Sequence, residues 1–259
     1  MLKVRVIPTL LWKNVGLVKG IGFDSWRRVG TILPAIKVYN TREVDELILV
    51  DISATLEGRA PDYDSIDGLS GECFVPLTVG GGIRTVEHIR DLLRAGADKI
   101  AINSAAYEDP QLIRESAQRF GSQCVVLSID ARKQADGSYE CYSHSGTRPT
   151  GKELASWARQ AESLGAGEIL LTSVERDGTM RGYDLQMLRT VTSQVRIPVI
   201  ASGGAGNYQH MYEAIEDAKS SAVAAASIFH FTEQTPLEAK QYLASKGIQV
   251  RNVNASKGD

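Results

Sequence analysis

Two pairs of adjacent glycines could form phosphate-binding loops. Gly81 and Gly82 lie in VGGGIRT, and Gly203 and Gly204 lie in ASGGAGN, each directly after an apolar stretch. Glycine lets the backbone approach a ligand closely, and a helix that starts there offers free N–H groups to an anion. Polar residues one strand further along could complete the sites: Asn103, Ser104 and Ser227. The glycines could instead only form tight turns, but their duplication favours one phosphate site in each half, and hence a ligand with an anionic group at each end.

Three aspartates follow apolar stretches and could transfer protons. Asp51 ends LILVD, Asp130 ends VVLSID, and Asp177 lies in the loop ERDGT. Acids in such positions can form ion pairs, cap loops or act as general acids and bases. We predict a catalytic role for Asp130, whereas capping and function are equally open for Asp51. The pair Asp177-Gly178 could offer backbone N–H groups to the second phosphate.

The first apolar stretch lacks the acid that this pattern leads one to expect. The segment RVIPTLLWKN continues from its apolar part into Leu11 and Trp12. Leucine cannot transfer a proton, so any reaction that needs two acids would be altered here.

Charged residues lie at or near the other ends of four predicted strands: Arg5, Glu46, Lys99 and Glu168. Charges in a protein core are costly unless they are paired, and two cations could pair fully with two anions. Position alone therefore predicts a structural layer of salt bridges at the base of a barrel.

Short apolar strands alternate with amphipathic helices along the chain. The predicted strands are Val4–Leu11, Glu46–Ile52, Pro76–Val79, Lys99–Asn103, Cys124–Asp130, Glu168–Ser173, Pro198–Ser202 and Ala222–Ala226. Most are continuous apolar runs, as in parallel strands buried on both faces. Between them, a helix such as TVEHIRDLLRAG is expected to begin at Thr85 and end at Gly96. Eight such units in about 250 residues predict an α/β fold, the (β/α)8 TIM barrel. A doubly wound open sheet is the alternative.

The sequence also contains an internal repeat. Glu46 and Glu168 occupy equivalent places 122 residues apart, and the same offset relates Asp62 to Asp184, Pro76 to Pro198, and the two glycine pairs. A half-barrel has therefore been duplicated, and this favours a closed barrel. One insertion interrupts the alternation of strands and helices after Asp130, where Asp136-Gly137 predicts a hairpin over the barrel mouth.

Composition narrows the possible functions. The 259 residues carry 29 basic and 31 acidic side chains, without a long run of either sign. Neither nucleic acid nor a membrane is expected as a partner, and we expect a cytoplasmic protein. The three cysteines and four histidines share no metal spacing, so we expect no metal site and no cofactor. We expect a single barrel over residues 1–250 and a flexible tail over 251–259.

The sequence resembles the cyclase subunit of imidazole glycerol phosphate synthase along nearly the whole chain. The resemblance is densest in LTVGGGIRT, RAGADKIAINSAA, RFGSQCVV, GAGEILLTSVERDGT, IPVIASGGAGN and SIFHF. In that family, the base of the barrel binds a glutaminase subunit, and ammonia passes through the barrel to a bisphosphate ribulosyl substrate at the mouth. The resemblance implies that Arg5, Glu46, Lys99 and Glu168 form the ammonia gate and that Asp98 and Gln123 contact the glutaminase. It also implies that Asp130 is one of two catalytic acids. The implied substrate and phosphate contacts are Lys19, Gly82, Asn103, Ser104, Asp177, Gly204 and Ser227.

Leu11 replaces the second catalytic acid of that family. The segment KNVGLVKGIGFDSWRRVGT and the stretch around RAPDYD also depart from the family pattern. These departures resemble a paralogous branch whose barrel is associated with turning an acetamido sugar into an acetamidino sugar for surface polysaccharide. In that branch the partners are a glutaminase and a sugar-amidating enzyme. Our first hypothesis is an ammonia-channelling barrel of this branch, the second is the histidine-pathway cyclase, and the third is a non-catalytic scaffold that activates a glutaminase.

Overall fold

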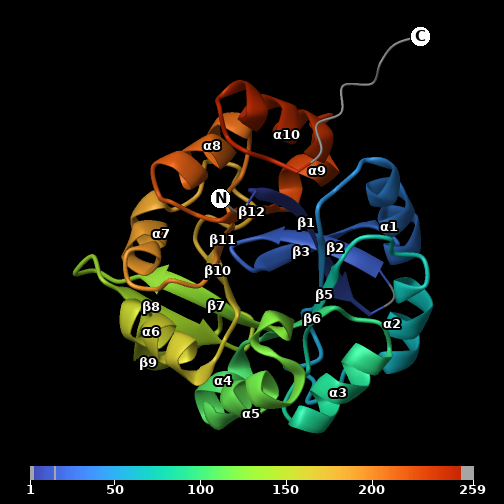
Figure 1. Ribbon diagram of the computed structural model, residues 1–259, viewed down its shortest axis with the longest axis vertical. Coiled ribbons are helices and arrows are strands. Elements are labelled where there is room, and N and C mark those ends of the chain that lie inside the picture. Colours follow the sequence, from blue (N-terminus) through green and yellow to red (C-terminus); the bar gives the residue numbers. More distant parts are fainter. Residues whose placement is uncertain (1–2, 15, 252–259) are drawn as a thin grey trace.

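Eight parallel strands form a closed barrel in the computed structural model, which describes residues 3–14 and 16–251 (Figure 1). The ring closes because β10 pairs with both β11 and β7. In order around the barrel the strands are β1 (Arg5–Lys13), β4 (Leu47–Asp51), β5 (Leu77–Gly80), β6 (Lys99–Ile102), β7 (Val125–Lys133), β10 (Glu168–Ser173), β11 (Val199–Ser202) and β12 (Ala222–Ala225). The predicted (β/α)8 fold is confirmed, and the open sheet is excluded.

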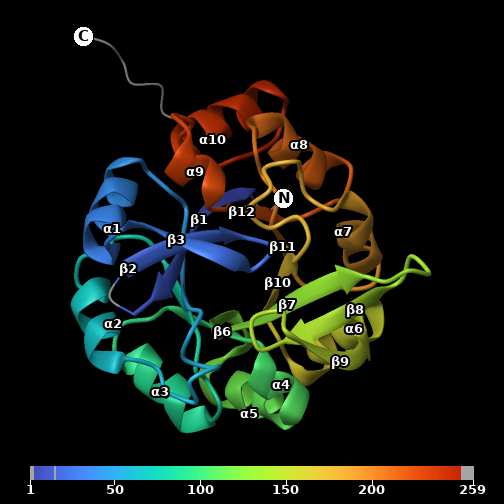
Figure 2. The ribbon, with the colours of Figure 1, turned by 180° about the vertical axis from the view of Figure 1, so that it is seen from behind.

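Helices surround this ring, as the two opposite views show (Figures 1 and 2). They are α1 (Ile32–Thr41), α2 (Tyr63–Ser70), α3 (Val86–Arg94), α4 (Ser104–Glu108), α5 (Gln111–Phe120), α6 (Leu154–Leu164), α7 (Leu185–Thr192), α8 (Tyr208–Glu216), α9 (Ser227–Phe231) and α10 (Pro236–Ser245), with a short 3-10 turn at Ser122–Cys124. Helix α3 shows how the sequence forms such a helix: Thr85 caps its first turn, and Ile89 and Leu92 are buried against the strands. No helix in the described ranges is long and apolar enough to cross a membrane.

The strands divide their side chains between two separate cores. On β1, Leu10 and Trp12 face outward and belong to the large core shared with the helices. Ile7 faces inward and packs in a smaller core inside the barrel. The inner core consists of apolar residues from seven strands: Ile7, Ile48, Ala101, Val126, Leu170, Ile200, Ala222 and Ala224. It separates the charged base from the polar mouth.

The internal repeat is visible in matched local structure. Asp62 and Asp184 each cap a helix, accepting hydrogen bonds from the backbone N–H groups of Ser65 and Met187. Gly81 and Gly203 both have positive φ and lie against the backbone of the preceding strand's end. Equivalent residues in the two halves therefore make equivalent contacts.

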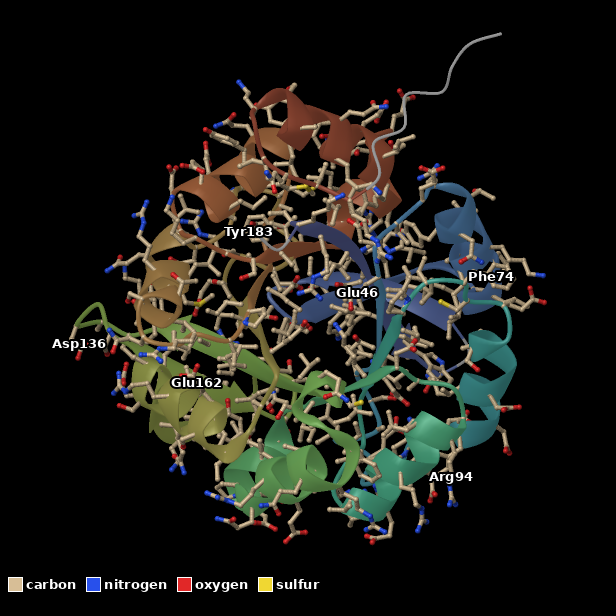
Figure 3. The ribbon with its side chains drawn as sticks, in the orientation of Figure 1. Glu46, Phe74, Arg94, Asp136, Glu162 and Tyr183 are labelled. Atoms are coloured by element: carbon tan, nitrogen blue, oxygen red, sulfur yellow. The ribbon has the colours of Figure 1, made fainter. Side chains whose placement is uncertain are left out.

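Two hairpins extend from the mouth. The predicted one follows β7 and contains β8 (Tyr139–Ser143) and β9 (Arg148–Glu153). Its Asp136-Gly137 turn lies at the edge of the molecule (Figure 3), and residues 144–147, which join β8 to β9, lie over the mouth instead. The second hairpin, β2 (Gly16–Ile21) and β3 (Asp24–Gly30), was not predicted. Of the expected tail, all but Arg251 lies outside the described residues.

Candidate functional site

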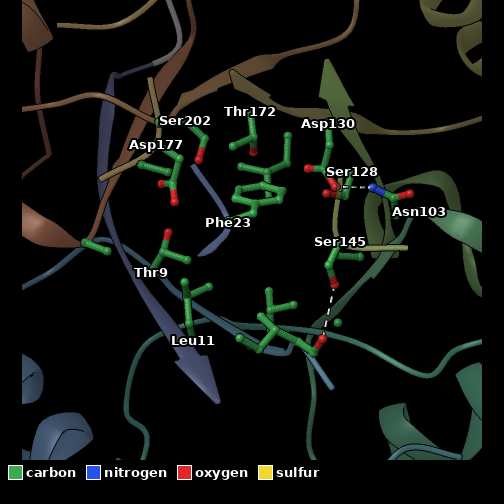
Figure 4. Close-up of a pocket in the computed structure, with 18 of the residues that line it drawn as sticks. Thr9, Leu11, Phe23, Asn103, Ser128, Asp130, Ser145, Thr172, Asp177 and Ser202 are labelled. Carbon is green, nitrogen blue, oxygen red and sulfur yellow. Dashed lines mark hydrogen bonds between the residues drawn. The ribbon is translucent and has the colours of Figure 1, made fainter. Parts of the chain in front are cut away.

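A cavity of about 140 Å³ opens at the carboxyl ends of the barrel strands (Figure 4). Its floor includes Ala101, Leu170 and Ala224 of the inner apolar core. Its upper wall contains most of the residues that the sequence singled out: Leu11, Lys19, Asp51, Gly81, Gly82, Asn103, Ser104, Asp130, Asp177, Gly178, Gly203, Gly204 and Ser227. The structure thus brings the predicted mouth residues to one site.

Asp130 is the cavity's most perturbed acid. Its carboxylate accepts a hydrogen bond of 2.8 Å from the Asn103 side-chain amide. Burial, followed by the negative charge of Asp177, raises the pKa of Asp130 to about 7, against the opposing effects of Asn103 and Arg132. A carboxyl group with such a pKa can both accept and release a proton near neutral pH.

Leu11 and Thr9 lie across the cavity from Asp130 (Figure 4). Leu11 is paired in the sheet with Val50 of β4 and Val18 of β2, so its surroundings are mainly apolar. The Thr9 hydroxyl is buried and has no hydrogen-bond partner within the described part of the chain. This side of the mouth therefore presents a methyl-rich wall and one available hydroxyl where a second acid would be needed for two-acid chemistry.

Lys19 of β2 forms a buried ion pair with Asp177. The distance from Lys19 Nζ to Asp177 Oδ2 is 2.6 Å, and Lys19 is only 2% exposed. The Gly22 N–H also donates to the Asp177 carbonyl at 2.9 Å. A Cβ on Gly178 would lie 2.1 Å from the Gly20 carbonyl, so glycine is needed there for the close approach. The ERDGT loop consequently fixes the β2–β3 hairpin beside the mouth.

Asp51 caps the loop that follows β4. Its Oδ1 accepts hydrogen bonds from the N–H groups of Ser53 and Ala54 and from the Ser53 hydroxyl. Its Oδ2 lies 3.1 Å from the Arg59 guanidinium. Of the two roles that the sequence left open, these contacts favour capping, although the residue also lines the cavity.

The paired glycines lie on opposite sides of the mouth. Gly81 and Gly82 follow β5, whereas Gly203 and Gly204 follow β11, four strands away in the ring. Substitution would be obstructed by backbone, because a Cβ on Gly204 would approach the Gly182 carbonyl to 2.2 Å.

Polar residues at the next strand ends lie beside these loops. Asn103 and Ser104 begin α4, next to the first glycine pair, and Ser227 begins α9, next to the second. The Ser104 hydroxyl accepts from the His144 N–H at 2.9 Å. The Ser227 hydroxyl is buried without a partner among the described residues, and it is therefore free to bind a ligand.

Four charges close the base of the barrel. Arg5 contacts Glu46 at 2.5 Å and Glu168 at 3.0 Å, while Lys99 contacts Glu168 at 3.2 Å and also bonds to Glu46. Each cation therefore bridges both anions, as the charge balance predicted. Glu46 lies near the barrel axis in Figure 3.

Asp98 and Gln123 are exposed at the same end of the molecule. Asp98 precedes β6 and accepts a 2.8 Å hydrogen bond from the Leu77 N–H, while Gln123 lies just before β7. Both side chains are thus placed around the base, where a partner could reach them.

Several residues that cover the mouth could not be recognised from the sequence. Phe23 and Trp26 from the β2–β3 hairpin line the cavity, as does Ser145 from the β8–β9 loop. The Ser145 hydroxyl donates to the Ile52 carbonyl at 3.1 Å, across from one hairpin to the end of β4. Gly22, in the turn that joins the paired residues Ile21 and Asp24, is the sequence signal that could have indicated the missed hairpin.

Comparisons with known proteins agree with this architecture. The sequence model of the family described as histidine biosynthesis protein matches residues 5–235. The chain is 50% identical over 251 residues to the imidazole glycerol phosphate synthase subunit HisF of Chlorobaculum parvum. It is 49% identical to the subunit HisF of Chlorobaculum tepidum and 48% identical to that of Chlorobium luteolum. Each alignment covers 97% of this chain and 100% of the relative.

Proposed function

Since the chain belongs to the histidine biosynthesis protein family, we propose that it is the synthase subunit of a glutamine amidotransferase of the imidazole glycerol phosphate synthase type. In this proposal a glutaminase binds the base of the barrel and releases ammonia there. The ammonia passes the ion-pair ring and the inner apolar core, and it reacts at the mouth with a phosphorylated substrate.

The ring of Arg5, Glu46, Lys99 and Glu168 carries the proposal. Its place at the strand starts, at the opposite end of the barrel from the cavity, also fits a structural salt-bridge layer, and the similarity to imidazole glycerol phosphate synthase subunits favours a gate there. Between ring and cavity the interior is lined by small and aliphatic side chains such as Ala101 and Ala222. Neutral ammonia crosses such a lining more readily than the ammonium ion, because burying an unpaired charge is costly.

At the mouth, we assign the two glycine pairs, with Ser104 and Ser227, to the two ends of the substrate. Asp130 is the proton-transfer group, since burial brings its pKa near neutrality. Lys19, held by Asp177, contacts the substrate from the hairpin side.

The ring-closing reaction of histidine biosynthesis is our first candidate for the chemistry, because the most similar relatives cited above are all imidazole glycerol phosphate synthase subunits. The identity of these relatives argues against the first hypothesis from the sequence, the sugar-amidation branch. That branch remains a second candidate, and the specific observation in its favour is Leu11, which leaves the β1 side of the mouth without an acid.

The experiment is to supply the bisphosphate ribulosyl substrate with ammonium, or with glutamine and the cognate glutaminase, and to measure imidazole glycerol phosphate. The first candidate predicts product from both nitrogen sources, at a rate lowered by roughly 10² or more because one acid is missing. Stimulated glutamine hydrolysis without any imidazole glycerol phosphate would contradict the first candidate and favour a different ammonia acceptor.

A further inference from the structure

A buried ion pair outside the gate and the mouth connects the last helix to the base of the barrel. Lys240 of α10 is 1% exposed, and Asp45, which precedes β4, is 3% exposed. Lys240 Nζ lies 3.4 Å from Asp45 Oδ1 and donates to the Glu43 carbonyl at 2.5 Å. Helix α10 lies in the outer layer (Figure 1), so the lysine reaches inward from the helices to the strand starts.

The other oxygen of the Asp45 carboxylate holds the neighbouring strand. Asp45 Oδ2 accepts a 2.9 Å hydrogen bond from the backbone N–H of Val6. Val6 directly follows Arg5, and Asp45 directly precedes Glu46. The Asp45 carboxylate therefore holds the backbone beside Arg5 and lies beside Glu46 in the chain, and these two gate residues are in contact at 2.5 Å.

We propose that Lys240 and Asp45 are positioning residues for the gate: their ion pair fixes the start of β1 against the start of β4, and so sets the contact of Arg5 with Glu46. This inference rests on the proposed function, because it assigns a second layer of residues to the ammonia entrance. Neither residue lines the cavity at the mouth, so neither is expected to act on the bound substrate.

An unpaired buried charge is costly, and the Lys240–Asp45 pair avoids this cost at the barrel base. Without Lys240, the Asp45 carboxylate would be buried without its cation, a situation that is strongly unfavourable. Burial already raises the pKa of Asp45, and Lys240 and the Val6 N–H oppose this rise. Loss of the lysine would therefore favour the neutral carboxyl, which is a weaker acceptor for the Val6 N–H. The starts of β1 and β4 would then be less firmly held together.

The test compares Lys240→Met with the wild type in the complex with the cognate glutaminase. The readout is the ratio of product formed from glutamine to product formed from ammonium, with the bisphosphate ribulosyl substrate. We expect this ratio to fall by about fivefold, a coupling typical of residues in one contact network, while the rate with ammonium stays unchanged. In a Lys99→Ala background, where the gate is already broken, Lys240→Met should lower the ratio no further.

A matched control separates positioning from general stability. Thr235→Ala removes the capping box at the start of the same helix, where the Thr235 hydroxyl accepts from the Glu238 N–H at 3.2 Å. This variant should lower the melting temperature but leave the ratio at its wild-type value. If Lys240→Met does not fold, Asp45→Asn serves in its place, because its amide oxygen can still accept from Val6 while the charge pair is lost.

An unchanged ratio in a folded Lys240→Met or Asp45→Asn protein would overturn the inference, and so would equal losses in the wild-type and Lys99→Ala backgrounds. A wild-type complex that transfers no ammonia from glutamine would instead refute the proposed function, and the inference with it. The two failures are therefore distinguishable by the wild-type measurement alone.

Discussion

Asp130 is the residue whose environment most changes its chemistry. Because burial and Asp177 raise the pKa of Asp130 to about 7, the folded protein binds this proton more tightly than the unfolded chain does. The proton bound to Asp130 therefore contributes to the free energy of unfolding. This contribution is complete below the unfolded pKa of about 4 and is lost as the pH rises through about 7. The acid to which we assign proton transfer thus destabilises the fold when it is ionised.

Asp130→Asn should therefore stabilise the protein while abolishing turnover. We expect the melting temperature to rise by a few degrees relative to the wild type, and to rise more at about pH 8 than at about pH 5. The amide can still meet the Asn103 side chain, so the local packing is kept. Thermal unfolding at the two pH values is the measurement. An equal change at both would show that Asp130 does not titrate in this range.

At Leu11, restoring an acid should increase imidazole glycerol phosphate formation only in part. Leu11→Asp places a carboxyl opposite Asp130, but the apolar neighbours Val50 and Val18 would raise its pKa. We expect a gain of about tenfold, below the 10²–10⁴-fold range of a well-placed general acid or base. Leu11→Asn is the matched control, since it adds a polar group that cannot take a proton, and it should give no gain. Equal rates for the two variants would refute the inference that position 11 is where the second catalytic acid is missing.

At the level of elements, the two halves of the barrel should bind one anion each. Titration calorimetry with inorganic phosphate should detect binding to the wild type, and Gly204→Ala should weaken one site by about tenfold or more, because its Cβ would meet the Gly182 carbonyl. Gly151→Ala is a suitable control: Gly151 also has positive φ, but a Cβ there has open space. Unchanged phosphate binding in Gly204→Ala would indicate that these glycines only form turns.

The elements also show which parts of the molecule could be predicted from its sequence. The barrel strands were recognisable because buried parallel strands are continuous apolar runs, and the repeat fixed their number. The β2–β3 hairpin was missed because β3 is largely exposed and polar, and because one of the turn residues is Phe23 rather than glycine or asparagine. The hydrogen bond from Ser145 to the Ile52 carbonyl could not be predicted, since it depends on how far the β8–β9 loop reaches across the mouth.

At the scale of the whole molecule, the charged base and the polar mouth are separated by the apolar core of the barrel. The sequence placed the base charges and the mouth acids at opposite strand ends, but it could not show which charges contact one another. In the structure Arg5 and Lys99 each bridge Glu46 and Glu168.

Breaking this ring should uncouple the two ends. Lys99→Ala leaves Glu46, which is buried, and Glu168, which is partly buried, with one cation between them, which is unfavourable. We expect the rate with glutamine to fall by roughly tenfold and the rate with ammonium to change by less than about twofold. Arg119→Ala, on the exposed surface of α5, is the control and should leave both rates unchanged. Equal losses with both nitrogen sources would mean that Lys99 acts only on folding.

The most direct test of the account is the rate of glutamine hydrolysis by the cognate glutaminase, measured alone and with a saturating amount of this protein. If the base of the barrel docks and activates a glutaminase, the rate should rise by at least about tenfold. Asp98→Lys should lower the affinity of the complex, because Asp98 is exposed at the docking end. An unchanged hydrolysis rate, with no complex detected by sedimentation at the same concentrations, would contradict the central claim that this barrel receives its ammonia from a glutaminase.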